Sequence, residues 1–198
     1  MFTKAFDRRV YAAAAVLAGT GALGTAFGLF ALWPSNMEAG YAPEQPIAFS
    51  HLTHAGTLRI DCLYCHTEAE KGPHATVPPV SVCMNCHEQV KPKDLRGQVK
   101  PDVARLLDHW SRKEPIRWVK VSDLADFVYF DHSRHLAGGV TCQECHGPVE
   151  KMERVRREHG LKMSGCLACH RKPPLPGRPA ALAEPDHQAP TTCSTCHR

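Results

Sequence analysis

All ten cysteines of the chain fall in five copies of one pentapeptide, Cys-x-x-Cys-His. Two thiols at this spacing can form thioethers with the two vinyl groups of one porphyrin, and the histidine that follows can bind the iron as its proximal ligand. Each copy therefore predicts one covalently attached haem c, five in all. The expected attachment residues are Cys62, Cys65, Cys83, Cys86, Cys142, Cys145, Cys166, Cys169, Cys193 and Cys196, and the expected proximal ligands are His66, His87, His146, His170 and His197.

Other uses of paired cysteines fit the pattern less well. A zinc site draws its four ligands from two such pairs and places no demand on the next residue, which is histidine in all five copies here. The closely spaced run of a ferredoxin is absent, and a disulfide framework would not repeat the histidine. Haem is therefore the predicted group, and electron transfer is the predicted chemistry.

Eight further histidines are available as distal ligands. They are His51, His54, His74, His109, His132, His135, His159 and His187. Two of them stand in each of two Phe-x-His-x-x-His segments, which begin at Phe49 and Phe130 and precede the first and third Cys-x-x-Cys-His motifs. A His-x-x-His pair places two imidazoles on one side of a short turn, where each can reach a different iron. We therefore predict that His51, His54, His132 and His135 are distal ligands, giving low-spin irons with no open position.

The fifth distal ligand has several candidates. Met163 lies three residues before Cys166, and its thioether would give one His/Met iron of raised potential. His74, in a turn between the first two motifs, is the main alternative. The remaining candidates are Met152, His109, His159 and His187.

The two Phe-x-His-x-x-His segments belong to an internal repeat. The offset between equivalent residues is 81 at the histidines, 80 at the first cysteines and 83 at the second motif of each set. This offset predicts two homologous two-haem modules in tandem. The expected organisation is a cytoplasmic start and anchor (1–33), a tether (34–48), a first module (49–98), a linker (99–129), a second module (130–172) and a proline-rich arm with the fifth haem (173–198).

Regular secondary structure is expected to be sparse. The chain has 16 Pro and 14 Gly, so a conventional apolar core is hard to build and the haems themselves are expected to form the core. One amphipathic helix is predicted after Pro101, because Val103, Leu106, Leu107 and Trp110 repeat at helical spacing. The predicted fold class is a single N-terminal transmembrane α-helix followed by a multihaem cytochrome c domain of loops and short helices.

The segment from Val10 to Trp33 carries no charge and follows Lys4, Arg8 and Arg9. As a helix it would be about 36 Å long, enough to cross a hydrocarbon core of about 30 Å. A cleaved signal peptide has a shorter apolar region and a small-x-small site, so we predict an uncleaved single-pass anchor in a bacterial inner membrane. The preceding basic residues place the N-terminus in the cytoplasm and the haem domain in the periplasm.

The chain also resembles a known family, the pentahaem subunit of bacterial alternative complex III. The resemblance is carried by residues 46–51, 60–67, 83–87, 127–147, 163–171 and 193–198. It implies a subunit of a membrane quinol:electron-acceptor oxidoreductase that relays electrons to a periplasmic cytochrome c or a similar acceptor. The implied partners are an iron–sulfur subunit related to molybdoenzymes, polytopic quinol-binding subunits and a monohaem cytochrome c. Lys120 stands where the family carries a histidine, so no ligand is expected from that segment.

Three functions compete at this stage. The first is an electron-transfer subunit with no catalytic site of its own. The second is a stand-alone quinol dehydrogenase similar to the membrane-anchored tetrahaem family, and the third is a multihaem reductase of a small oxyanion, which needs an open iron. The mild net charge of +4, without a basic stripe interleaved with aromatics, gives no indication of nucleic-acid binding.

Overall fold

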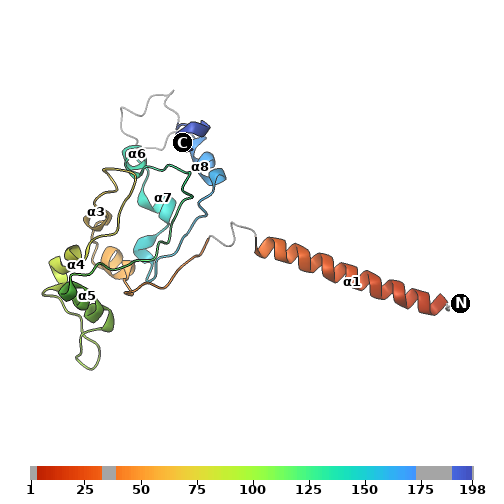
Figure 1. The fold of residues 1–198 in the computed structure, drawn as a ribbon, viewed down its shortest axis with the longest axis horizontal. Helices are drawn as coiled ribbons and strands as arrows, with labels where there is room; N and C mark the ends of the chain where they lie inside the picture. The colour runs from red at the N-terminus through yellow and green to blue at the C-terminus, as the bar shows by residue number, and fades with distance from the viewer. Residues whose placement is uncertain (1–3, 33–38, 173–188, 198) are drawn as a thin grey trace.

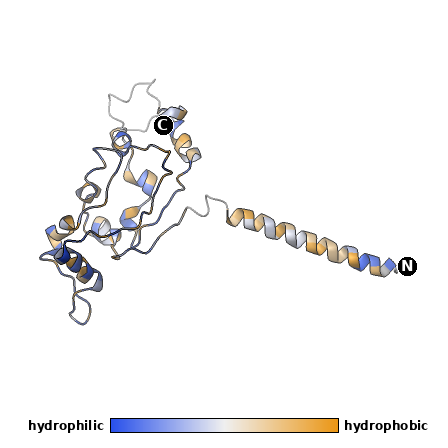
Figure 2. Ribbon diagram, in the orientation of Figure 1, coloured by the Kyte–Doolittle hydropathy of each residue, from blue (hydrophilic) through white to orange (hydrophobic). Residues whose placement is uncertain are grey.

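The computed structural model describes residues 4–32, 39–172 and 189–197. Parts of the predicted tether and of the C-terminal arm, together with His187, lie outside these residues. The first element is α1 (Lys4–Ala31), a long helix that stands apart from the rest of the chain and is apolar along most of its length (Figures 1 and 2). By length and composition it is able to cross a membrane, and none of its apolar window is buried against the domain. An N-terminal signal sequence can meet the same criteria of length and hydropathy.

The rest of the described chain consists of loops and short helices, as the sequence predicts (Figure 1). Its pairing of strands is limited, among the described residues, to an isolated bridge between Lys93 and Val99. The elements are a π-helical segment η1 (Leu52–Thr57), α3 (Cys62–Cys65), α4 (Val80–His87), α5 (Pro101–Arg112), α6 (His132–Ala137), α7 (Cys142–His146), a 3-10 turn η2 (Val149–Lys151), α8 (Met163–His170) and α9 (Cys193–Cys196).

Every Cys-x-x-Cys pair lies within one of five short helices: α3, α4, α7, α8 and α9. Side chains just before the cysteines start two of these helices. Asp61 accepts a hydrogen bond from the Leu63 N–H at the start of α3, and Thr141 forms a capping box with Glu144 at the start of α7. The single helical turn brings the two thiols of each pair to the same side of the backbone.

The predicted amphipathic helix is α5, with Pro101 in its first turn. Leu106 is buried, Leu107 packs beside it, and Trp110 at the end of the predicted stripe remains 42% exposed. The helix ends at Arg112, before Pro115, because Lys113 adopts the left-handed conformation that closes a helix C-terminus.

The apolar core is small. Five apolar side chains are buried among the described residues: Ile47, Ala69, Met84, Leu106 and Met152. Three of them, Ile47, Met84 and Leu106, form one cluster, against which Ile116 and Trp118 of the linker also pack. So few buried side chains cannot offset the conformational entropy of a domain of this size, which agrees with the expectation that prosthetic groups fill its centre.

The two predicted modules, residues 49–98 and 130–172, contact each other at two places. In one direction, η1 of the first repeat packs on η2 of the second, where the Leu52 N–H donates to the Met152 carbonyl at 2.9 Å. Gly56 allows this approach, because a Cβ at this position would collide with the Glu150 carbonyl oxygen. In the other direction, the Ser133 N–H at the start of α6 donates to the Gly72 carbonyl of the first repeat.

Candidate haem sites

Predicted distal and proximal histidines lie opposite each other in pairs. The ring centroids are 6.2 Å apart for His54 and His87, 6.3 Å for His132 and His146, and 6.0 Å for His135 and His170. An imidazole nitrogen binds a transition metal at about 2.0 Å, so two imidazoles on opposite sides of one iron place their centroids about 6 Å apart. Each pair therefore has the separation that a bis-histidine iron requires.

The fourth pair is His51 with His66. Burial, followed by the charges of His66 and His54, lowers the pKa of His51 to about 4. The electrostatic contact with His66 places His51 beside the histidine of the first motif. Across the four pairs one rule holds: the first histidine of each His-x-x-His segment meets the first motif of its repeat, and the second histidine meets the second motif.

Hydrogen bonds orient most of these imidazoles. Nδ1 lies 2.6 to 3.2 Å from a backbone carbonyl oxygen in His54, His66, His87, His132, His135, His170 and His197. Because a carbonyl can only accept, Nδ1 of each ring carries the proton and Nε2 keeps its lone pair for a metal. His51 differs, since its Nδ1 is buried without a hydrogen-bond partner. The tautomers of seven rings are thus set in advance for ligation through Nε2.

The phenylalanine of each Phe-x-His-x-x-His segment packs on both histidines. Phe49 stacks on His54 with centroids 4.3 Å apart and meets His51 edge-on at 4.9 Å. Phe130 repeats this geometry, at 4.3 Å from His135 and 4.8 Å from His132. The aromatic ring therefore holds the two imidazoles at a fixed angle to each other.

The cysteines connect the five motifs in one spatial order. Cys65 of the first motif lies beside Cys86 of the second, and Cys62 lies beside Cys142 of the third. Cys145 of the third motif neighbours Cys169 of the fourth. In the same way, Cys166 of the fourth motif neighbours Cys196 of the fifth. The order is second, first, third, fourth, fifth, which differs from the order along the chain.

None of the ten cysteines is joined to another by a disulfide. Burial, and then the neighbouring cysteine, raises the pKa of Cys65, Cys83, Cys145 and Cys166 above the ordinary thiol value. Free thiols on the same side of a helical turn, next to an imidazole with a free Nε2, suit covalent haem attachment.

The fifth motif lacks a matching imidazole pair among the described residues. The ring beside His197 is that of Phe127, with centroids 5.7 Å apart, and the Phe127 carbonyl accepts from His197 Nδ1. Met163 begins α8, the helix whose Cys166 neighbours Cys196, and its side chain is 62% exposed. The structure therefore places Met163 on the helix next to the fifth motif.

The other candidates for the fifth distal ligand lie elsewhere. His74 is exposed in the loop whose backbone carbonyls accept hydrogen bonds from His66 and His132. These two imidazoles already lie beside His51 and His146. Met152 is 3% exposed and packs in the protein interior. His109 lies in α5 with a buried, unpartnered Nδ1, and His159 is exposed.

Three features of the chain fit covalent haem: its thiols occur in pairs, its imidazoles lie opposite each other at the required separation, and the hydrogen-bonded rings keep Nε2 available for a metal. Residues 128–198 match the protein-family model described as cytochrome c7 and related cytochrome c. These residues therefore resemble that family, and the chain has the features of a multihaem c-type cytochrome with several covalent haem c groups, whose chemistry is electron transfer.

Two proteins of Nitratidesulfovibrio vulgaris resemble the chain. The multiheme cytochrome c subunit of menaquinone reductase is 32% identical over 104 residues, which are 52% of this chain and 46% of that protein. The high-molecular-weight cytochrome c is 25% identical over 137 residues, which are 69% of this chain and 22% of that protein. The matched part of the chain thus spans less than half the length of either relative.

Proposed function

We propose that the chain carries five haem c groups and relays electrons as a membrane-anchored subunit without a catalytic site of its own. The observation that carries this proposal is the set of opposed imidazole pairs. In three of these pairs the ring centroids are 6.0 to 6.3 Å apart. An iron between two such rings has six ligands and no position for a substrate. Low-spin irons of this kind exchange electrons with small structural change, which suits a relay.

The contacts between motifs support a linear path through the haems. In the order second, first, third, fourth, fifth, each haem would lie next to one or two other haems, to which it can pass an electron. The haem of the second motif, beside α4 and α5, forms one end. The haem of the fifth motif, beside α9, forms the other. Electrons then enter at one end of the row and leave at the other.

We further propose that Met163 binds the iron of the fifth motif opposite His197, with His74 as the alternative. The position of α8 next to the fifth motif supports Met163 as the ligand. His74 is the weaker candidate, because its loop lies beside His66 and His132, which are proposed ligands of other irons. A Met163→Ala variant should convert one of the five irons to a high-spin form. A His74→Ala variant should leave the spin states unchanged, and the reverse result would replace Met163 by His74.

The finer assignment is to a quinol-linked complex of the bacterial inner membrane, such as alternative complex III. The relative whose name places it in menaquinone reductase supports a complex that exchanges electrons with quinones. The apolar α1 supports a single-pass anchor with the haem domain in the periplasm. The proposed partners are an iron–sulfur subunit, polytopic quinol-binding subunits and a monohaem cytochrome c.

A stand-alone quinol dehydrogenase is the second candidate, because it would also have one N-terminal helix such as α1. Full-length protein purified from membranes, alone and with its partners, separates the two. We expect a pyridine haemochrome assay and intact mass to give five haems per chain, carbon monoxide to leave the reduced spectrum unchanged, and quinol oxidation only in the complex. Quinol oxidation by the isolated chain would favour the second candidate. Stoichiometric carbon monoxide binding would overturn the relay.

A further inference from the structure

One short loop contacts ligands of two different irons. We call residues 72–76 the junction loop. Its Pro73 carbonyl accepts a hydrogen bond from His132 Nδ1 at 2.6 Å, and its Thr76 carbonyl accepts one from His66 Nδ1 at 2.6 Å. His132 is the proposed distal ligand for the third motif, whereas His66 is the proximal ligand of the first. The two carbonyls therefore serve haems that belong to different repeats.

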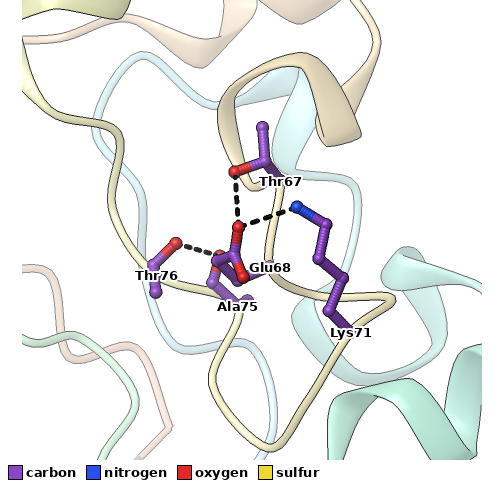
Figure 3. Close-up of polar contacts among 5 residues, drawn as sticks. All are labelled: Thr67, Glu68, Lys71, Ala75 and Thr76. Atoms are coloured by element: carbon purple, nitrogen blue, oxygen red, sulfur yellow. Dashed lines mark hydrogen bonds and ion pairs between the residues drawn. The ribbon is translucent and has the colours of Figure 1, made fainter.

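The junction loop is held at both ends. At its start, the Gly72 carbonyl accepts from the Ser133 N–H, which ties the loop to α6. At its end, Thr76 has a φ of +59°, an uncommon conformation for a β-branched residue, and its hydroxyl donates to the Ala75 carbonyl at 2.8 Å. Figure 3 shows this hydroxyl turned towards Ala75, with the Glu68–Lys71 pair alongside. The conformation of the junction loop is thus defined by hydrogen bonds at both of its ends.

The two irons concerned are neighbours in the proposed path. Cys62 and Cys142, which would attach the two haems, lie beside each other. His66 also lies within electrostatic range of His146, the proximal ligand of the third motif. The step between these two haems is therefore the crossing from the first repeat to the second.

We propose that the junction loop is a positioning element that sets the reduction potentials of these two haems together. This inference rests on the proposed haem loading. A carbonyl that accepts from Nδ1–H makes the imidazole a stronger donor to iron, which stabilises the ferric form and lowers the potential. Since both carbonyls belong to one held loop, a displacement changes both ligands in the same direction. The reduction potentials of the haems of the first and third motifs then stay close to each other.

Substitutions at two exposed residues of the full-length protein test whether the junction loop couples the two potentials. Thr76→Val removes the hydroxyl that supports the left-handed conformation, and Pro73→Gly frees the backbone beside the other carbonyl. Each variant should raise the potentials of both haems, by about tenfold in the reduction equilibrium constant, or about 59 mV for one electron, and leave the other haems unchanged. The measurement is a redox titration followed by EPR.

The haem of the third motif can be recognised, because the rings of His132 and His146 are nearly parallel, at 3°, whereas two other pairs are inclined at 45° and 55°. The haem of the first motif is assigned from the signal that changes in a His51→Met variant. Val77→Ala is the matched control, since that side chain is exposed directly after the same loop and carries no charge; it should shift nothing.

A shift confined to one haem in each variant would overturn the inference, because the two carbonyls would then act independently. Equal potentials in variant and parent would overturn it as well. A haemochrome assay on every variant separates these outcomes from failure of the proposed function, which would give fewer than five haems in the parent protein.

Discussion

The two repeats use the same residues with different backbones. In the first repeat His54 lies in a π-helical segment, whereas in the second His132 and His135 lie in the α-helix α6. Even so, the angles between phenylalanine and histidine rings agree within a few degrees, at 23° and 26° for the stacked pairs. The ring geometry is therefore shared by the repeats, while the hydrogen-bonding pattern of the helix is not. Packing on the phenylalanine constrains the ligands more closely than the type of helix does.

The second difference lies in the hydrogen bonds of the first histidine of each pair. His132 Nδ1 donates to the Pro73 carbonyl, and His51 Nδ1 has no partner. The repeats are thus equivalent in ligand type but not in the environment of the ligand. The haems of the first and third motifs, which would be identical in a simple duplication, are expected to differ on their distal sides.

Loss of a distal ligand is expected to have the largest effect. His54→Ala should open the iron of the second motif, and His135→Ala that of the fourth, because each imidazole faces one proximal ring. In each variant one haem should become high-spin and bind carbon monoxide after reduction. Carbon monoxide difference spectra measure the stoichiometry. The pairing rule would fail if either variant opened two haems or a haem of the other repeat.

Glycine substitutions should affect the repeats unequally. Gly56→Ala places a methyl group against the Glu150 carbonyl, between η1 and η2, and should lower the free energy of unfolding by about 1–3 kcal/mol. Gly138→Ala, directly after α6, meets the His135 carbonyl oxygen at 3.2 Å and should change the free energy of unfolding by about 0.5 kcal/mol or less. Denaturant unfolding of the haem-loaded proteins compares the two. Equal effects would mean that the contact between η1 and η2 contributes little.

Truncation of the side chain before the first histidine of each pair should have the smallest effect, a local change in amide hydrogen exchange. Asp131 accepts hydrogen bonds from the N–H groups of Ser133 and Arg134 at the start of α6, and Ser50 accepts one from the Thr53 N–H. Asp131→Ala should therefore speed amide hydrogen exchange in 132–137 more than Ser50→Ala does in 52–57. The opposite order would show that η1 depends on its hydroxyl more than α6 depends on its carboxylate.

The sequence predicted the features that depend on local spacing. The long apolar helix and the amphipathic helix after Pro101 are present as α1 and α5, since both follow from hydrophobic periodicity and proline placement. The repeat offset also indicated which histidines would have equivalent places. The assignment of Met163 stays a prediction, because spacing places it near the fourth motif while the iron that it is proposed to bind belongs to the fifth.

Other features could not be predicted because side-chain identity does not encode them. The carbonyl groups of Pro73 and Thr76 act through the backbone, which every residue has, so no residue type marks them. The spatial order of the motifs depends on contacts such as Cys62 with Cys142, between residues far apart in the chain. The ring packing of Phe49 was the exception that could have been found, since phenylalanine recurs two residues before each His-x-x-His pair.

The scarcity of buried apolar side chains has a consequence for how the protein is made. With five such side chains among the described residues, the polypeptide lacks the means to fold before its prosthetic groups are attached. Newly made chains without haem would remain open to proteases, and only matured chains would persist. The cellular level of the cytochrome should then follow the supply of haem and the capacity of its attachment machinery more closely than transcription.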